Sequence, residues 1–329
     1  MAEEMAGLGP ADLRAARVHV GRVARVTPLV PSEALGERRG YRVALKCENL
    51  QLGGAFKIRG ASHFLGRLEE SERRRGVVTY SSGNHAIALS LAARRAGVPA
   101  VVVMPEKAPA VKVAAVRALG AELHFTGSTS LERQARAEEL ARDRGLVVVP
   151  PFDHPWIIAG QASCGVEIQE QWPEVGAVLV PVGGGGLLAG IALACGYHRA
   201  GIRVIGVEPE GAAAMAASLQ AGAPVTLPAP HSIADGLLPS RPGDLTTSVA
   251  KRFVETIITV SDDAIRAAAA FLLRREHLLV EWSGAVGVAA LLSAHPGLPG
   301  VPTVAVLSGG NADPAAILAA ADAAPRGDR

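Results

Sequence analysis

The chain has 329 residues, of which 49% are hydrophobic and 19% are charged, and its formal net charge is +2. This balance indicates a folded globular protein, and the small net charge provides no electrostatic footprint for nucleic acid or for a membrane surface. The length allows two lobes, because domains usually have about 100 to 200 residues. Composition therefore favours a small-molecule function.

The cysteines and the first 20 residues indicate the cellular compartment of the protein. Cys47, Cys164 and Cys195 are widely spaced and form no CxxC pair, so we expect neither a disulfide framework nor a metal site. A reducing, cytoplasmic setting fits such a chain. The first 20 residues are partly acidic and lack the pattern of a signal or transit peptide. No apolar run reaches the roughly 18 residues of a bilayer span.

From about residue 42 onward, short β-branched runs alternate with longer stretches of helical period. This alternation is typical of βαβ units, in which helices cover both faces of a parallel sheet. The sequence therefore predicts an α/β fold with mostly parallel sheets. The predicted strands cover residues 41–47, 77–80, 100–104, 121–125, 146–150, 177–182, 203–208, 256–260 and 303–308.

One part of this pattern is compact. Residues 76–150 hold three or four strand–helix units joined by short turns, and the Pro-rich stretch "PPFDHPWII" (150–158) is the predicted exit from them. We therefore expect a small, mobile, substrate-binding domain of residues 76–150. It would be inserted into a larger domain made of residues 1–75 and 151–329.

The stretch "GGAFKIRGA" (53–61) places Lys57 at the start of a predicted helix, directly after a glycine-containing turn. It is either a surface lysine of an ordinary helix or a covalent handle. The positive end of the helix dipole disfavours an ammonium ion and therefore lowers the pKa of a lysine at that position. A lysine with a lowered pKa is the type of side chain that forms Schiff bases.

A second polar turn follows the strand at 77–80. Ser81, Ser82, Gly83, Asn84 and His85 lie where that strand meets the next helix. Ser and Asn are common helix caps, but capping requires one such residue rather than five. We expect a ligand-binding loop here.

Four consecutive glycines in "PVGGGGLLAGIALAC" (181–195) follow an apolar strand and open an apolar helix. Backbone N–H groups and the helix dipole converge on an anion in such a turn, which predicts a phosphate site. A nicotinamide dinucleotide is an alternative ligand, because Gly184, Gly186 and Ala189 fit the GxGxxA pattern and Glu208 ends the next strand.

A third loop, "LSGGN" (307–311), also ends a predicted strand. Ligands of open α/β sheets bind outside the carboxyl ends of the strands. The loops at 81–85, 183–187 and 308–311 are therefore expected to converge on one edge, together with Lys57.

The motifs "KCENLQLGGAFKIRGA", "SSGNHA", "PVGGGGLLAGI" and "LSGGN", in this order, resemble the pyridoxal-phosphate enzymes of fold type II. The similarity is strongest to the serine/threonine dehydratase and serine racemase group, and it extends over nearly the whole chain. It implies a two-lobed fold like that of the tryptophan synthase β chain, pyridoxal 5'-phosphate as the cofactor, and a homo-oligomer.

The resemblance also implies residue roles. Lys57 would bind the cofactor as a Schiff base, Phe56 would lie near the ring, Asn84 would contact the 3-hydroxyl, and Ser308 would meet the pyridine nitrogen. The phosphate would be bound by the backbone of Gly183, Gly184, Gly185, Gly186 and Leu187. The substrate carboxylate would be bound by Ser81, Asn84 and His85, with Arg133 and Ser240 as further candidates.

The implied reaction is the dehydration and deamination of L-threonine or L-serine to a 2-oxo acid and ammonia, with Lys57 as the base. The alternatives are a serine racemase, in which Ser82 supplies a proton to the opposite face, and a dehydratase of another 3-hydroxyamino acid. A nicotinamide-dependent dehydrogenase and a non-catalytic relative are more distant alternatives. Neither nucleic acid nor a membrane is an expected partner.

Four positions depart from the family pattern, and the first of them, Ala55 in place of a common Ser, is expected to be tolerated. Ile87 replaces a common Gln, and Trp282 replaces a common Pro, so the preferred hydroxyamino acid is left open. The cation site of the racemases needs a second acidic residue where this chain has Ala214. Glu208 is then either an exposed carboxylate at a strand end or part of a residual cation site. The histidines outside the 81–85 loop show no metal-ligand spacing and are expected at the surface or in loops.

Overall fold

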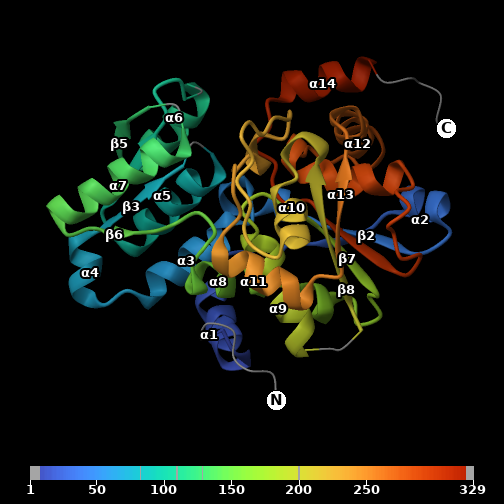
Figure 1. Ribbon diagram of the computed structural model, residues 1–329, viewed down its shortest axis with the longest axis horizontal. Coiled ribbons are helices and arrows are strands. Elements are labelled where there is room, and N and C mark those ends of the chain that lie inside the picture. The colour runs from blue at the N-terminus through green and yellow to red at the C-terminus, as the bar shows by residue number, and fades with distance from the viewer. Residues whose placement is uncertain (1–7, 82, 109, 128, 199–200, 324–329) are drawn as a thin grey trace.

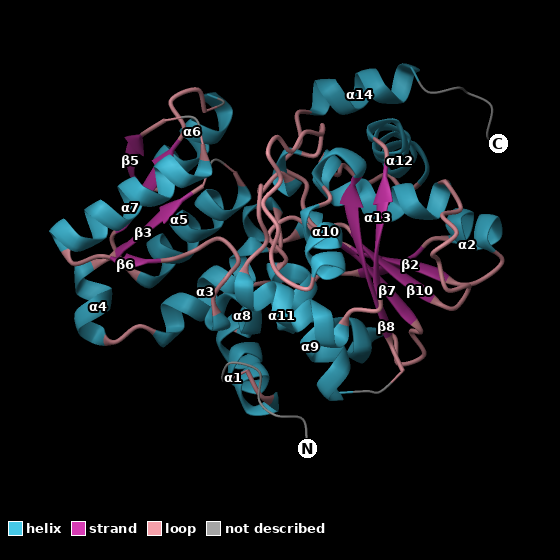
Figure 2. Cartoon of the chain, in the orientation of Figure 1, coloured by secondary structure: helices cyan, strands magenta, loops and turns pink. Residues whose placement is uncertain are grey.

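Two separate sheets, each covered by helices, organise the chain (Figures 1 and 2). The computed structural model describes residues 8–81, 83–108, 110–127, 129–198 and 201–323. A six-stranded sheet has the strand order β1-β2-β10-β7-β8-β9, and a four-stranded sheet has the order β5-β4-β3-β6. All pairings are parallel except that of β1 with β2, so the predicted α/β class is confirmed.

The large sheet is built from strands at both ends of the sequence. Its strands are β1 (Leu29–Pro31), β2 (Val43–Lys46), β7 (Ala177–Pro181), β8 (Arg203–Pro209), β9 (Thr256–Val260) and β10 (Thr303–Val306). The small sheet uses only the middle of the chain. Its strands are β3 (Val77–Tyr80), β4 (Ala100–Met104), β5 (Glu122–Phe125) and β6 (Val147–Val148).

Fourteen α-helices and four short 3₁₀ helices are present among the described residues. The α-helices are α1 (Pro10–Gly21), α2 (Glu33–Arg39), α3 (Lys57–Arg67), α4 (Glu70–Arg75), α5 (Asn84–Ala96), α6 (Ala110–Ala118), α7 (Ser130–Arg144), α8 (Pro155–Gln171), α9 (Gly186–His198), α10 (Ala214–Ala221), α11 (Asp244–Phe253), α12 (Asp262–Arg275), α13 (Trp282–Leu292) and α14 (Pro314–Ala323). The 3₁₀ helices are η1 (Glu48–Leu50), η2 (Leu52–Gly54), η3 (Glu210–Ala212) and η4 (Asp235–Leu237).

All nine predicted strands are present, although several are shorter than predicted. Strand β7, "AVLVP", is buried along its whole length, as expected for a strand covered by helices on both faces. Strand β1 was not predicted. It has three residues, ends in Pro31 and forms the antiparallel edge of the large sheet.

The two lobes lie side by side, with the small lobe on the left of Figure 1 and α3, α8 and the connecting loops between the lobes. The small sheet draws its strands from residues 77–148. The division of the chain into domains stays a prediction. Within the described ranges, no helix is long and apolar enough to cross a membrane.

Buried residues of two types, cysteine and histidine, bear on the sequence analysis. Cys47, Cys164 and Cys195 are free thiols in the core. His63, which was expected at the surface or in a loop, is only 2% exposed, because it lies on the inner face of α3. Its Nδ1 lies 3.1 Å from Nδ1 of His19 on α1.

Candidate active site

Lys57 is the first residue of α3. Its ammonium nitrogen, Nζ, donates a hydrogen bond of 2.7 Å to the carbonyl oxygen of Pro151 and lies 5.1 Å from the centre of the Phe56 ring. Burial lowers the pKa of Lys57 to about 8. The expected direction of this shift is therefore present, but its cause is desolvation rather than the helix dipole.

The "LSGGN" loop lies directly beside the start of α3. The amide of Phe56 donates to the carbonyl of Ser308 at 3.1 Å, and Ala55 forms an isolated bridge with Gly309. Ser308 is 4% exposed, and its hydroxyl makes no hydrogen bond with another described residue. A hydroxyl in this state, on a residue with little exposure, is suited to a polar atom of a bound ligand.

The polar loop at 81–85 meets the same edge. Asn84 begins α5, and its amide nitrogen donates to Oε1 of Glu281 at 2.6 Å. The amide of Asn311 donates to Oδ1 of Asn84 at 2.8 Å, which joins this loop to "LSGGN". Ser81 accepts from the Gly83 amide at 3.3 Å, and Ser82 lies outside the described residues.

His85 is 2% exposed, and its Nε2 lies 3.2 Å from the carbonyl oxygen of Val149. Burial, followed by the nearby charge of Lys57, lowers the pKa of His85 to about 3. The imidazole is therefore neutral at physiological pH, and its ring faces the chain segment that leaves the small lobe. Its assignment to the substrate carboxylate stays a prediction.

The glycine loop connects β7 to α9, which begins at Gly186. Gly185 has a φ of 92°, a conformation that L side chains rarely adopt. A Cβ on Gly184 would collide with the ring of Phe152. The turn therefore presents backbone rather than side chains at a helix N-terminus, a cradle that fits a phosphate. Leu187, in the first turn, is buried.

The segment 149–153, between β6 and α8, links these loops, and the sequence analysis identified it only as the exit from the small lobe. Its carbonyls contact His85 and Lys57, as described above, and Phe152 packs against the glycine loop. Asp153 accepts hydrogen bonds from the first three amides of α11. Backbone carbonyls carry no side-chain signal, so only the fold reveals this role.

Glu281 is a second residue that the sequence analysis missed. It precedes α13, is 7% exposed and bonds to Asn84 of the other lobe. Burial raises the pKa of Glu281 to about 7. Its position in "LLVEWSGAVG", before an apolar helix, resembles an ordinary helix start, and the sequence signal for its role was weak.

The remaining candidates lie in two other segments. Arg133 is on α7, is 8% exposed and donates to Oγ of Ser130 at 3.2 Å; burial lowers the pKa of its guanidinium. Ser240 is half-buried in the loop before α11, and its carbonyl accepts from the Leu227 amide at 2.7 Å. Neither contact is made with a residue of the loops around Lys57.

Glu208 is not the exposed carboxylate that was one of its two expected states. It is fully buried, and its carboxylate accepts hydrogen bonds from the amides of Met215 and Ala216 at 2.8 and 2.9 Å, at the start of α10. Burial raises the pKa of Glu208 to about 7. Within the described ranges, no three His, Cys, Asp or Glu side chains are grouped as a metal site.

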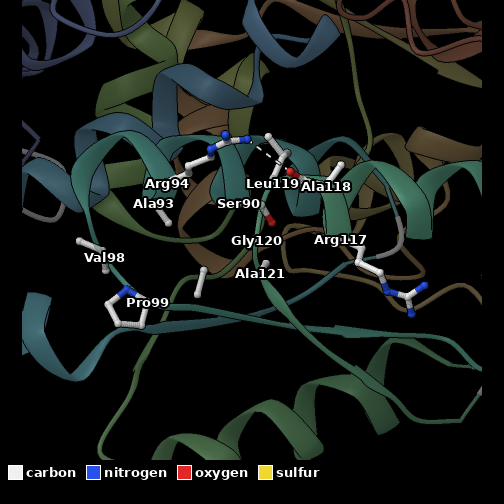
Figure 3. A pocket seen from close by; sticks show the side chains of 11 residues that line it. Ser90, Ala93, Arg94, Val98, Pro99, Arg117, Ala118, Leu119, Gly120 and Ala121 are labelled. Carbon is white, nitrogen blue, oxygen red and sulfur yellow. Dashed lines mark hydrogen bonds between the residues drawn. The ribbon is translucent and has the colours of Figure 1, made fainter.

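Two surface pockets lie away from these loops. One, of about 440 Å³, opens on the small lobe between α5 and the end of α6, where Arg94 donates to the carbonyl of Ala118 at 3.3 Å (Figure 3). The other, of about 690 Å³, lies beside β1 and α2. The residues that line them include none of the predicted site residues.

The geometry defines a class of protein. A half-buried, weakly basic lysine, a glycine cradle at a helix N-terminus and an unpaired hydroxyl converge at the carboxyl ends of parallel strands. This arrangement is suited to a phosphate-bearing carbonyl cofactor attached to Lys57.

Comparison with known proteins identifies the family. Residues 20–309 match the family described as "Pyridoxal-phosphate dependent enzyme", and the chain belongs to it. The predicted family, fold type and cofactor are thereby confirmed.

Named relatives cover most of the chain. An L-threonine ammonia-lyase of Thermotoga maritima is 41% identical over 92% of this chain and 75% of its own. An L-threo-3-hydroxyaspartate ammonia-lyase of Saccharomyces cerevisiae is 39% identical over 87% of this chain and 88% of its own. The solved structure of maize serine racemase superposes with a TM-score of 0.91 at 35% identity, covering 97% of each chain. Two of these three names agree with the predicted lyase.

Proposed function

We propose that this protein is a pyridoxal-phosphate dependent ammonia-lyase that converts L-threonine, L-serine or both to the 2-oxo acid and ammonia. The observation that carries the proposal is Lys57, whose pKa burial lowers to about 8. Its amine bonds to Pro151, next to the Phe152 that packs on the glycine loop, and its neighbour Phe56 bonds to Ser308. The ammonia-lyase names of the relatives support this choice of reaction.

The cofactor would be held by three groups of this chain. The backbone of residues 183–187 would bind the phosphate, the Ser308 hydroxyl would meet the pyridine nitrogen, and Lys57 would form the covalent attachment. When bound, pyridoxal phosphate withdraws electrons from Cα of the amino acid, so that the Cα proton becomes removable. A hydroxyl partner leaves the pyridine nitrogen uncharged, which favours prompt loss of the β-hydroxyl.

The proton is moved by Lys57. With a pKa of about 8, a substantial fraction of its side chain is neutral near pH 7.5, so the amine is competent to accept the Cα proton at Nζ. The hydrogen bond to Pro151 fixes the direction of the amine. Asn84, oriented by Glu281 and Asn311, is proposed to contact the cofactor's 3-hydroxyl, and burial of the surrounding side chains excludes water.

The substrate carboxylate is proposed to bind at the loop of residues 81–85, with Ser81, Asn84 and His85 as its contacts. Arg133 and Ser240 are further candidates, which would need a movement of their segments toward Lys57. Racemisation of serine is the second candidate function, because the maize serine racemase superposes on nearly the whole chain. Ser82 would then supply the opposite-face proton. A dinucleotide reading is disfavoured, since the Glu208 carboxylate is already bound by α10.

We also propose a homo-oligomer in the cytoplasm. Three buried free thiols are consistent with a reducing compartment. Val26, Leu50 and Leu279 are apolar, 56%, 44% and 36% exposed, and lie on segments that are joined by hydrogen bonds, so they offer a surface for a second copy.

The absorbance spectrum tests the function. We expect a visible band from the bound cofactor that changes when L-threonine is added, with release of 2-oxobutanoate. Lys57→Ala should lose both the lysine-bound band and the turnover, whereas Lys107→Ala, an exposed lysine of the small lobe, should behave as the wild type. A Lys57→Ala protein with an unchanged band and activity would overturn the proposal. Chiral analysis of L-serine reactions separates the lyase from the racemase.

A further inference from the structure

A cluster of four ionisable side chains lies beneath the site and has no part in the proposed chemistry. Lys46 of β2, Glu48 of η1, Arg59 of α3 and Glu167 of α8 are each no more than 1% exposed. Two buried cations face two buried carboxylates, and the half-buried Arg17 of α1 adds a cation at the edge, 3.4 Å from Glu167. Three of its members belong to the "KCENLQLGGAFKIRGA" motif, of which the proposed function uses only Phe56 and Lys57.

Arg59 is the centre of the cluster. Its Nε and Nη2 donate to the two carboxylate oxygens of Glu48, each at 2.7 Å, and its Nη1 and Nη2 donate to Glu167 at 2.8 and 2.7 Å. Nη1 also donates to Oγ of Ser163 at 3.0 Å. Only a planar guanidinium can serve two carboxylates and a hydroxyl in this way.

Lys46 completes the cluster from the sheet. Its Nζ donates to Glu167 at 2.7 Å, to the carbonyl of Thr27 at 2.9 Å and to Gln171 at 2.9 Å. These three contacts use all three ammonium donors. The cluster therefore connects the sheet, η1, α3 and α8 with no vacant donor on Lys46.

Stability alone does not account for such a cluster. The desolvation of buried charges often costs as much as their mutual attraction returns, and well-packed apolar side chains can replace them without loss of stability. Directed hydrogen bonds differ from apolar packing because they fix the position of one element along another, which is the register of the two elements. The relevant elements here are α3 and α8.

The register of α3 on α8 determines the surroundings of Lys57. Arg59 lies two residues after Lys57, and the N-cap residue Phe56 makes no side-chain capping bond, so conventional capping does not fix the helix start. The two helices touch through their backbones, because a Cβ on Gly160 would lie 2.6 Å from Cα of Gly60. Pro151, the acceptor of the Lys57 amine, lies just before α8.

We propose that Arg59, held by Glu48, Glu167 and Ser163, is a positioning residue that sets the register of α3 on α8 and thereby the place of the Lys57 amine. It contacts neither substrate nor cofactor, and it acts through Lys57. The inference rests on the proposed role of Lys57 as the attachment point of the cofactor.

The test is Arg59→Lys, which keeps the charge but removes the planar fork. The holoenzyme is measured for total bound pyridoxal phosphate and for the fraction that borohydride traps on Lys57, determined by mass spectrometry of the Lys57 peptide. We expect the trapped fraction to fall below half, and kcat to fall at least tenfold with less than a threefold change in KM. Arg67→Lys, in the last turn of the same helix, is the matched control and should match the wild type.

Ser163→Ala is a milder variant, which removes one contact between α3 and α8 and decides the matter if Arg59→Lys does not fold. It should lower the trapped fraction measurably and kcat about threefold. A lower unfolding midpoint with an unchanged trapped fraction and kcat, in whichever variant folds, would mean a purely structural role and would overturn the proposal. A failure of the proposed function would be recognised in a different experiment, because the cofactor would then remain covalently attached to the Lys57→Ala variant.

Discussion

Glu281 provides a sharp test of the site's electrostatics. Its carboxyl is buried between the lobes, and burial raises its pKa from an ordinary 4.5 to about 7. Between these two pH values the folded protein binds a proton that the unfolded chain releases. The folded-state pKa is the raised one, so the contribution to stability is present in full below pH 4.5 and is lost as the pH rises through about 7.

The substitution Glu281→Gln removes this titration and retains an oxygen that can accept from Asn84. Relative to the wild type, the variant should gain stability by about 1.4 kcal/mol per pH unit between pH 4.5 and 7, to a plateau of at most about 3 kcal/mol. Above pH 7 the gain should not increase further. The hydrogen bond of 2.6 Å from Asn84 opposes this shift and is already included in the pKa of about 7.

Urea unfolding of the cofactor-stripped protein at pH 5, 6, 7 and 8 measures the difference. Ser283→Ala is the matched control, because Ser283 is buried on the same helix and does not titrate in this range. Its effect should be the same at every pH. If the gap between Glu281→Gln and the wild type is also constant with pH, the carboxyl has an ordinary pKa and the reasoning is refuted.

Two further predictions rest on other parts of the structure. Burial lowers the pKa of His63 to about 3 and also lowers that of His19, so the free energy of unfolding falls as the pH drops below 6.5. His63→Gln should flatten this pH dependence in urea unfolding between pH 7 and 5. If the variant and the wild type lose stability with pH at the same rate, the assignment to His63 is wrong. Gly184→Ala should weaken pyridoxal-phosphate binding at least tenfold in an absorbance titration, because its Cβ would collide with Phe152. Gly21→Ala, whose Cβ meets nothing within 4 Å, is the control, and equal affinities would exclude the steric argument.

The large-scale fold was predictable because parallel strands buried on both faces are continuous apolar runs. Such a run identifies a strand without any knowledge of its neighbours, as in "AVLVP" of β7. Strand β1 escaped because three residues ending in Pro31 carry no such pattern. Its pairing with β2 is decided by the fold of the rest of the sheet.

The convergence of the site loops was predictable for a geometric reason. Residues that follow parallel strands collect at one edge of a sheet, and polar or glycine-rich turns at those places stand out in the sequence. The structure joins Phe56, the neighbour of Lys57, to Ser308 and joins Asn84 to Asn311, so the loops are neighbours. The roles of these residues toward cofactor and substrate stay predictions.

The features that the sequence did not predict share one property. Each depends on a contact between residues far apart in the chain, and neither residue alone indicates that contact. Lys46 and Glu48 belong to a quoted motif, yet nothing in their order shows that both are buried around Arg59. Glu281 likewise bonds to Asn84, which is 197 residues away in the chain, and its raised pKa is caused by burial that only the folded chain provides. Long-range pairs of this kind need the tertiary structure.

The segment 149–153 shows why the site and the two lobes depend on one another. At one end, the amide of Val149 donates to the carbonyl of Val78 in the small sheet at 2.8 Å. At the other end, Asp153 accepts from the first amides of α11 in the large lobe. Pro151, which accepts from Lys57, lies midway between these two anchors. The hydrogen-bonding partner of the Lys57 amine is therefore placed by both lobes. Lys57 itself is placed by α3, which packs both on α8 and on α5 of the small lobe. The geometry at the Lys57 amine therefore depends on how the two lobes are joined.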